Sequence, residues 1–321
     1  MTEPIFGRML TAMVTPFNPD GSLDLSGAKR LAAHLVDDLT NDGLVISGTT
    51  GESPTTTDQE KAELLAAVKA EVGDRANLIA GVGTNDTAHS IELAKQAEQA
   101  GADALLVVTP YYSLPPQSSI IDHFVAIADS TSLPVVLYDI PHRSGRAIET
   151  DSLLQLARHP RIVAVKDAKK DLDASGIVMS QTDLAYYAGD DAITLPLMSL
   201  GGVGLVGTST HFTGRIAHQM IDAFVAQDLT EALRLHRLLL PVFTGVFATQ
   251  GCLMVKAGLA HQGMPVGHCR APLGEAPPNW RRPSARSWTP PSCSRPRRRR
   301  GREARRFPRG GGHFVCRRRG D

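Results

Sequence analysis

The sequence predicts an α/β protein with a (β/α)8 (TIM) barrel, and three features lead to this fold class. Eight short apolar runs recur about every 20 to 35 residues in the first part of the chain. Most are apolar throughout, as expected for parallel strands covered on both faces. Helical patterns with recognisable ends lie between them. Eight such units over about 225 residues match a (β/α)8 barrel, and a doubly wound open sheet is the main alternative.

The elements follow from local patterns taken in chain order. Thr57 and Glu60 form a capping-box pattern at the start of one helix, and Gly73 ends it. Asp86 caps the next helix, which ends at Gly101. The expected strands are, in order, Met9–Val14, Leu44–Ser47, Leu78–Gly81, Ala104–Val108, Val135–Tyr138, Ile162–Lys166, Leu184–Ala188 and Gly204–Val206.

Three regions are expected along the chain. Residues 1–226 form the catalytic barrel, and residues 227–276 form a small C-terminal helical region. Two helices are expected in this second region, at Leu229–Phe247 and Cys252–Gln262. Residues 277–321 form an aberrant tail rich in arginine and proline.

The tail differs from the body in charge and composition. From residue 279 onward the chain has fifteen arginines and two acidic residues, whereas upstream it has 19 basic and 31 acidic residues, a net charge of −12. Prolines, like-charge repulsion and few apolar residues predict that the tail is disordered. Its composition is typical of out-of-frame translation of GC-rich DNA. We therefore expect a frameshift rather than a nucleic-acid-binding arm, since the basic residues of the acidic body are dispersed.

Composition also bears on the compartment. Hydrophobic residues make up 42% of the chain, an ordinary value for a globular protein. No run approaches the roughly 18 apolar residues that span a membrane, and Met1–Pro4 lacks the features of a signal peptide. The four cysteines, at positions 252, 269, 293 and 316, show no CxxC spacing and are interpreted as incidental thiols. We expect a cytoplasmic protein that does not enter membranes.

Other motifs predict no cofactor or metal. Gly202–Gly207 fits G-x-G-x-x-G, but it follows the helical pattern Leu195–Leu200 and contains the eighth strand, so it lacks the context of a dinucleotide site. The eleven histidines show no ligand spacing, which argues against a metal. Asp190 and Asp191 are interpreted as a helix cap rather than a cation site.

Lys166 is the most informative residue, because it closes the apolar run Ile162–Val165. Desolvation at the rim of a hydrophobic sheet disfavours the charged ammonium. A neutral amine attacks carbonyl carbons and forms a Schiff base, which is a route to covalent catalysis. For this residue alone, a lysine whose stem packs while its head reaches water is an equal alternative.

Polar residues at the ends of other strands favour the catalytic interpretation of Lys166. Gly48–Glu52, Thr109–Tyr112 and Tyr138–Gly145 follow the second, fourth and fifth strands. Loops after the strands of a barrel build its active site. Glycines and hydroxyls can hold a small carboxylate, a tyrosine can relay protons, and an arginine can bind a carboxylate through two hydrogen bonds. Together with Lys166, these loops predict one site.

These motifs, with Val163–Ala168, resemble the pyruvate-dependent class I aldolases of the dihydrodipicolinate synthase and N-acetylneuraminate lyase superfamily. The resemblance covers about Arg8–Leu273. It implies condensation of pyruvate with L-aspartate 4-semialdehyde to 4-hydroxy-tetrahydrodipicolinate, a step of lysine and diaminopimelate biosynthesis. The alternative is another pyruvate-dependent aldolase or dehydratase, acting on 2-keto-3-deoxy sugar acids or N-acetylneuraminate.

The resemblance also implies residue roles, and a homotetramer arranged as a dimer of dimers. It implies no metal and no diffusible cofactor, because the imine on the lysine is the electron sink. By this resemblance, Lys166 forms the imine and Tyr138 shuttles protons, linked through Thr49 to Tyr112 of a neighbouring subunit. Thr50 binds the pyruvate carboxylate, and Arg143 binds the carboxylate of the aldehyde. Gly189 and Val206 contact the ketoacid through backbone atoms.

Lysine inhibits many members of this family at a subunit interface. Members that respond to lysine often carry histidines at the positions of Asp58 and Lys61 in this chain, and a glutamate at the position of His89. The ammonium of Lys61 repels that of the ligand, so we expect weak lysine inhibition or none. The matching positions are Ser53, Pro54, Asp58, Lys61, Asn85, His89 and Tyr111.

Overall fold

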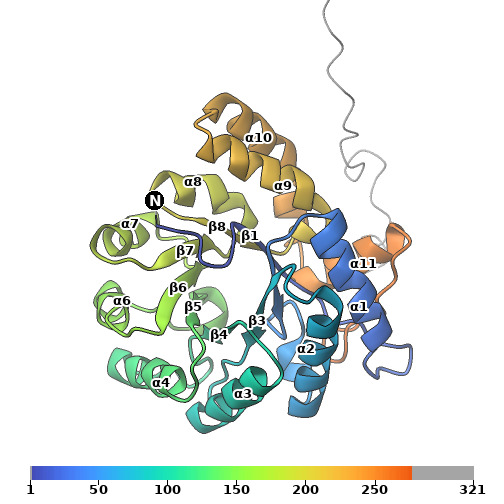
Figure 1. Cartoon of the computed structure of the whole chain (residues 1–321), viewed down its shortest axis with the longest axis horizontal. Coiled ribbons are helices and arrows are strands. Elements are labelled where there is room, and N and C mark those ends of the chain that lie inside the picture. Colours follow the sequence, from blue (N-terminus) through green and yellow to red (C-terminus); the bar gives the residue numbers. More distant parts are fainter. Residues whose placement is uncertain (1, 277–321) are drawn as a thin grey trace, which may run out of the picture. The chain divides into compact units, whose positions relative to one another are not determined.

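The computed structural model describes residues 2–276, so the predicted tail, 277–321, lies outside the described residues. Eight parallel strands form a closed barrel in sequence order, and β1 pairs with β8 (Figure 1). Closure confirms the predicted (β/α)8 barrel and excludes the open sheet. The strands are β1 (Met9–Ala12), β2 (Gly43–Ile46), β3 (Asn77–Gly81), β4 (Ala104–Val108), β5 (Val135–Asp139), β6 (Ile162–Asp167), β7 (Ala185–Ala188) and β8 (Gly204–Gly207).

The strands separate two apolar cores. Val136 and Ala164 belong to the cluster inside the barrel, whereas Leu137 and Val165 pack in the cluster beneath the surrounding helices. Successive side chains of a strand point to opposite faces. Lys166, two residues after Ala164, therefore points into the barrel near its carboxyl-terminal rim.

Helices surround the barrel (Figure 1). The predicted ends are largely confirmed: Thr57 and Glu60 form a complete capping box, and the Asp86 side chain accepts hydrogen bonds at the start of the next helix. The surrounding helices are α1 (Leu25–Ala33), continued by the π-helix η1 (His34–Asp38), α2 (Asp58–Val72), α3 (Thr87–Gln99), α4 (Gln117–Asp129), α6 (Thr150–Leu156), α7 (Leu172–Gln181), α8 (Thr194–Ser199) and α9 (Thr210–Val225).

Three short helices lie in the loops that follow strands. They are η2 (Ser53–Thr55) after β2, α5 (Pro141–Ser144) after β5 and η3 (Asp191–Ile193) after β7. Asp190 caps η3 through its side chain, as predicted for the helix that follows. Asp191 does not share that role, because its carboxylate turns to the residues after β8. The expected strand Met9–Val14 also ends earlier, at Ala12.

Within the described residues, two helices follow the barrel. These are α10 (Leu229–Gly245) and α11 (Gly251–His261), each within two residues of its predicted limits. Figure 1 shows α10 beside α9. The predicted boundary at residue 226 falls between α9 and α10, and the division of the chain into domains stays a prediction.

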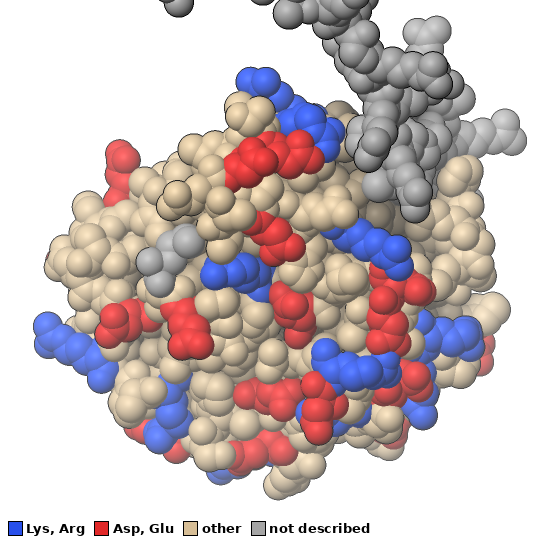
Figure 2. All heavy atoms as spheres, turned by 45° about the horizontal axis from the view of Figure 1, so that its top comes forward, with Lys and Arg blue, Asp and Glu red and all other residues tan. Residues whose placement is uncertain are grey.

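The surface carries dispersed charges of both signs. In the face shown in Figure 2, Lys and Arg side chains alternate with Asp and Glu, with no continuous basic patch on the described part of that face. Within residues 2–276, no helix combines the length and apolarity needed to cross a bilayer.

Candidate active site

Lys166 and Tyr138 meet at the carboxyl ends of β6 and β5. The two residues are register partners on neighbouring strands, and each is 5% exposed. The Nζ atom of Lys166 lies 4.3 Å from the centroid of the Tyr138 ring. The amine is therefore enclosed in the barrel mouth and lies over the face of an aromatic ring.

The environment of Lys166 favours its neutral form. Burial lowers its pKa from the ordinary value to about 8, and the charge of Arg143 acts in the same direction. The charge of Asp191 opposes this change. Roughly a tenth of the amine is therefore unprotonated at pH 7, far more than for an ordinary lysine, and this neutral fraction can act as a nucleophile.

Tyr138 keeps its proton in the same environment. Burial raises its pKa to about 12, while the charge of Arg143 and a hydrogen bond with Thr49 act in the opposite direction. The protonated phenol can donate a hydrogen bond to a carbonyl or hydroxyl oxygen beside Lys166.

The predicted residues share one cavity with few exceptions. Its volume is about 290 Å³, and residues of the turn between α10 and α11, including Phe247 and Gln250, also line it. Six of the eight predicted site residues line it, namely Lys166, Tyr138, Thr49, Thr50, Arg143 and Gly189. This volume suits a small ketoacid rather than a nucleotide.

Tyr138 also lines a second cavity. It measures about 240 Å³ and shares Thr49, Tyr138, Ile140 and Arg143 with the first. Ser53, Pro54 and Tyr111 also line this second cavity, so three of the positions expected near a lysine pocket lie together beside Tyr138.

Two predicted residues do not line the cavity that holds Lys166. Val206 is 2% exposed and belongs to the apolar cluster inside the barrel. Tyr112 is 90% exposed and has a left-handed backbone, with φ of +71°. This conformation is uncommon for a bulky side chain and holds the ring away from its own barrel. Within this chain, therefore, Tyr112 does not join Lys166 and Tyr138.

Glu52 closes the glycine-rich loop after β2 without facing the cavity. Its carboxylate is buried and pairs with Lys256 of α11, with Oε1 and Nζ 2.7 Å apart. The backbone N–H of Arg270 donates to Oε2 of Glu52 at 2.8 Å. The sequence predicted a ligand loop over Gly48–Glu52; only Gly48, Thr49 and Thr50 reach the two cavities.

Thr208 is a site residue that sequence reasoning missed. It follows β8 directly, lines the cavity with Lys166, and places its hydroxyl 3.5 Å from that of Thr50. The hydroxyl-rich run Thr208–Thr210 after a strand was the available signal, since loops after strands build the site.

The described residues offer one weak metal-ligand group, made of Glu52, Cys252 and Cys269. The two sulfur atoms lie 3.3 Å apart and both thiols are buried. The ammonium of Lys256 already binds the carboxylate of Glu52, so the group lacks the free anionic ligand that a cation needs.

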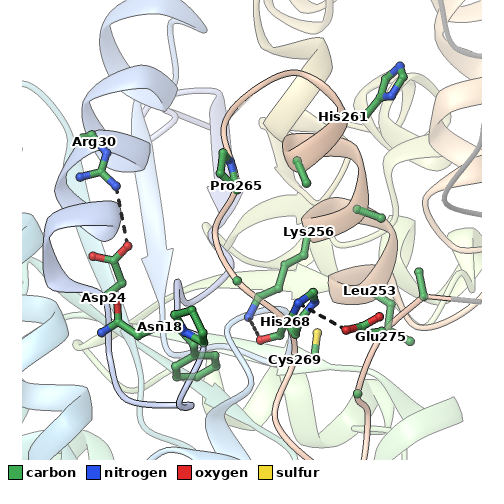
Figure 3. A pocket seen from close by; sticks show the side chains of 17 residues that line it. Asn18, Asp24, Arg30, Leu253, Lys256, His261, Pro265, His268, Cys269 and Glu275 are labelled. Atoms are coloured by element: carbon green, nitrogen blue, oxygen red, sulfur yellow. Dashed lines mark hydrogen bonds and ion pairs between the residues drawn. The ribbon is translucent and has the colours of Figure 1, made fainter.

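A larger cavity of about 620 Å³ lies beside α11 and the chain that follows it (Figure 3). None of the predicted catalytic residues lines it. Lys256 points across it and donates to the carbonyl of His268 at 3.0 Å, and the His268 ring pairs with Glu275. Its lining offers no group comparable to the Lys166 and Tyr138 pair.

A buried strand-end lysine beneath a tyrosine, in the mouth of a closed parallel barrel, defines a lysine-dependent aldolase of the (β/α)8 class. The model of the dihydrodipicolinate synthetase family matches residues 5–284. The chain belongs to this family.

Individual relatives agree with this assignment. The chain is 63% identical over 272 residues to the 4-hydroxy-tetrahydrodipicolinate synthase of Cutibacterium acnes, covering 85% of this chain and 93% of that protein. It is 62% identical over 271 residues to the enzyme of that name from Acidothermus cellulolyticus, covering 84% and 88%. The crystal structure of dihydrodipicolinate synthase from Bacillus anthracis superposes with a TM-score of 0.84 at 40% identity, covering 88% of this chain and 96% of that chain.

Proposed function

We infer that this chain is a lyase that condenses pyruvate with L-aspartate 4-semialdehyde to give 4-hydroxy-tetrahydrodipicolinate, in lysine and diaminopimelate biosynthesis. The observation that carries this function is the buried Lys166 amine beside Tyr138, in a chain 63% identical to a synthase of this reaction. The enzyme is a class I aldolase, in which the lysine itself forms the covalent intermediate.

Imine formation begins with attack of the neutral Lys166 amine on the keto carbon of pyruvate. Tyr138 donates a proton to the carbinolamine oxygen, which leaves as water. The carboxylate of pyruvate is held by Thr50, whose hydroxyl faces that of Thr208. Gly189 takes part through its carbonyl rather than its N–H, because the N–H already donates to the carbonyl of Asp167 at 2.7 Å.

Carbon–carbon bond formation follows from the same intermediate. Loss of a methyl proton from the imine gives an enamine, whose terminal carbon attacks the aldehyde. Arg143 binds the carboxylate of aspartate semialdehyde through two hydrogen bonds. The amino group of this substrate then attacks the imine carbon, closes the ring and releases the Lys166 amine. No metal or diffusible cofactor is needed, because the imine withdraws the electrons.

Tyr112 completes the proton relay from a neighbouring subunit. Its exposure of 90% and its outward backbone conformation support a role across an interface rather than in its own barrel. With Thr49 it forms a chain of hydroxyls that reaches Tyr138. We propose the dimer of dimers as the active form, in the cytoplasm.

Covalent trapping tests this function. Incubation with pyruvate and borohydride should add a pyruvate-derived mass to the peptide that carries Lys166. The Lys166→Ala variant should show no adduct, and an adduct that persists in it contradicts the assignment. Lys169→Ala, which changes a lysine ion-paired to Asp139, is the matched control and should keep the adduct.

A coupled assay separates the substrates. Turnover with pyruvate and aspartate semialdehyde is expected, and it should exceed cleavage of N-acetylneuraminate and of 2-keto-3-deoxygluconate. The reverse order would assign the chain to the sugar-acid branch of the superfamily, which shares the lysine and the tyrosine.

A further inference from the structure

Asp191 is a fully buried carboxylate that the reaction described above does not use. Its Oδ2 accepts the backbone N–H of Thr208 at 3.2 Å. Its Oδ1 accepts the N–H of Ser209 at 2.9 Å and also the hydroxyl of Ser209. Burial raises the pKa of Asp191, and the three hydrogen bonds, all donated to the carboxylate, oppose this and favour its ionised form.

The peptide of Thr208 is held from its other side by His211. The Nδ1 atom of this fully buried ring lies 2.8 Å from the carbonyl oxygen of Thr208, and Nε2 accepts the N–H of Val14 at 3.2 Å. Nδ1 is therefore assigned as the donor. Burial lowers the pKa of His211 to about 4, so the ring is neutral. Asp191 and His211 thus fix both polar groups of the backbone at Thr208.

Thr208 connects Asp191 and His211 to the cavity that contains Lys166. The Thr208 side chain lines the cavity that contains Lys166, and its hydroxyl lies 3.5 Å from that of Thr50. Asp191 therefore controls the position of the Thr208 hydroxyl, which lies next to the Thr50 hydroxyl that holds the pyruvate carboxylate.

The charge of Asp191 also acts on the reacting nitrogen. Two charged groups act on Lys166: Asp191 favours its cationic form, and Arg143, after β5, opposes it. The neighbouring Asp190 is paired with Lys170, at 2.5 Å, and its side chain is 18% exposed. A protonated imine carries its positive charge on the same nitrogen as the ammonium, so the buried carboxylate stabilises both.

We propose that Asp191 is a positioning residue of this active site, which holds Thr208 beside Thr50 and places a buried carboxylate behind the wall of the cavity that contains Lys166. The inference rests on the function proposed above. The carboxylate of Asp191 then has two effects: it places the Thr208 hydroxyl, and it supplies a buried negative charge.

Asp191→Asn tests it, because the amide keeps the size of the side chain and removes its charge. Loss of the group that favours the ammonium lowers the pH at which Lys166 becomes neutral. The rate of imine formation is measured against pH by cyanoborohydride trapping with pyruvate. The acidic limb of this pH profile should move about one pH unit lower. Turnover at the optimum should fall roughly tenfold, because the cationic imine loses that same stabilisation.

Asp190→Asn is the matched control, since it makes the same chemical change at the adjacent residue. Its acidic limb should stay at the wild-type pH. If Asp191→Asn is insoluble, Ser209→Ala removes one donor to the carboxylate and should move the limb in the same direction by a smaller amount. A wild-type pH profile in Asp191→Asn, or in Ser209→Ala where only that variant folds, overturns the proposal. Failure of the wild-type protein to trap pyruvate would instead contradict the proposed function.

Discussion

Glu52 and Lys256 form an ion pair in which both side chains are buried, 0% and 4% exposed, with Oε1 and Nζ 2.7 Å apart. The pair joins the loop after β2 to α11, which are far apart in the sequence. Gly51 and Glu52 follow directly on Thr49 and Thr50, and Glu52 has a left-handed backbone, with φ of +58°. The helical region after the barrel therefore fixes the loop that carries two residues of the site.

Lys256→Met should strongly destabilise the fold. The variant leaves the Glu52 carboxylate buried without its cation, a change that costs about 3–5 kcal/mol. The midpoint of urea unfolding measures it. Arg234→Ala breaks an exposed pair with Glu231 and should leave the midpoint unchanged. Equal midpoints for Lys256→Met and the wild type would show that the pair does not support the fold.

Imine formation should depend on pH through Lys166. Because its pKa is lowered to about 8, the reactive amine is mostly present above pH 8 and is lost as the pH falls through that value. The rate of pyruvate trapping at low pyruvate should drop roughly tenfold for each unit below this pH. A midpoint near that of an ordinary lysine would contradict the effect assigned to burial.

Tyr138→Phe should retain pyruvate binding and slow turnover by roughly 10²–10⁴, the usual contribution of one acid–base group. Tyr187→Phe is the control for loss of a buried hydroxyl. Its Oη contacts the backbone of Phe6 and Gly7 rather than the cavity. Steady-state kcat with saturating pyruvate distinguishes the two variants, and equal losses in both would remove the special role of Tyr138.

Arg143→Ala should spare imine formation and impair use of the aldehyde. Loss of a charge-assisted contact should lower kcat/KM for aspartate semialdehyde about 10- to 100-fold. Arg146→Ala removes an exposed arginine of the same loop that lines neither cavity beside Tyr138, and it should have little effect. Unchanged aldehyde kinetics in Arg143→Ala would favour a sugar-acid substrate.

The barrel was predictable because its signals are local. Continuous apolar runs placed β4 at Ala104–Val108 without error, and the capping box of α2 could be found from two residues three positions apart. The proximity of Lys166 and Tyr138 was predictable because loops at strand ends of a barrel converge.

What the sequence missed depends on contacts between distant residues. Asp191 resembles a helix cap by position, but its partners Thr208 and Ser209 follow another strand. Glu52 belongs to a ligand-like motif, but its partner lies in α11. The residue type of Tyr112 fits the predicted site, but its position could not be predicted, because its side chain is 90% exposed and does not line the cavity of Lys166.

Lysine inhibition should be weak or absent. The charged groups at the expected pocket already have partners: Lys61 donates to the carbonyl of Thr56 at 2.5 Å and lies 3.7 Å from Asp58, while the His89 ring lies 2.8 Å from the same carboxylate. Asp58 is therefore not free to bind the ammonium of an added lysine, and the Lys61 ammonium repels it.

Turnover measured against lysine concentration tests this expectation, with the Lys61→His variant as comparison. Removing the fixed ammonium at residue 61 should increase sensitivity to lysine relative to the wild type. The Lys69→His variant, which changes a lysine of the same helix paired with Asp103, should behave like the wild type. Strong inhibition of the wild-type enzyme at submillimolar lysine would show that the paired charges rearrange to admit the ligand.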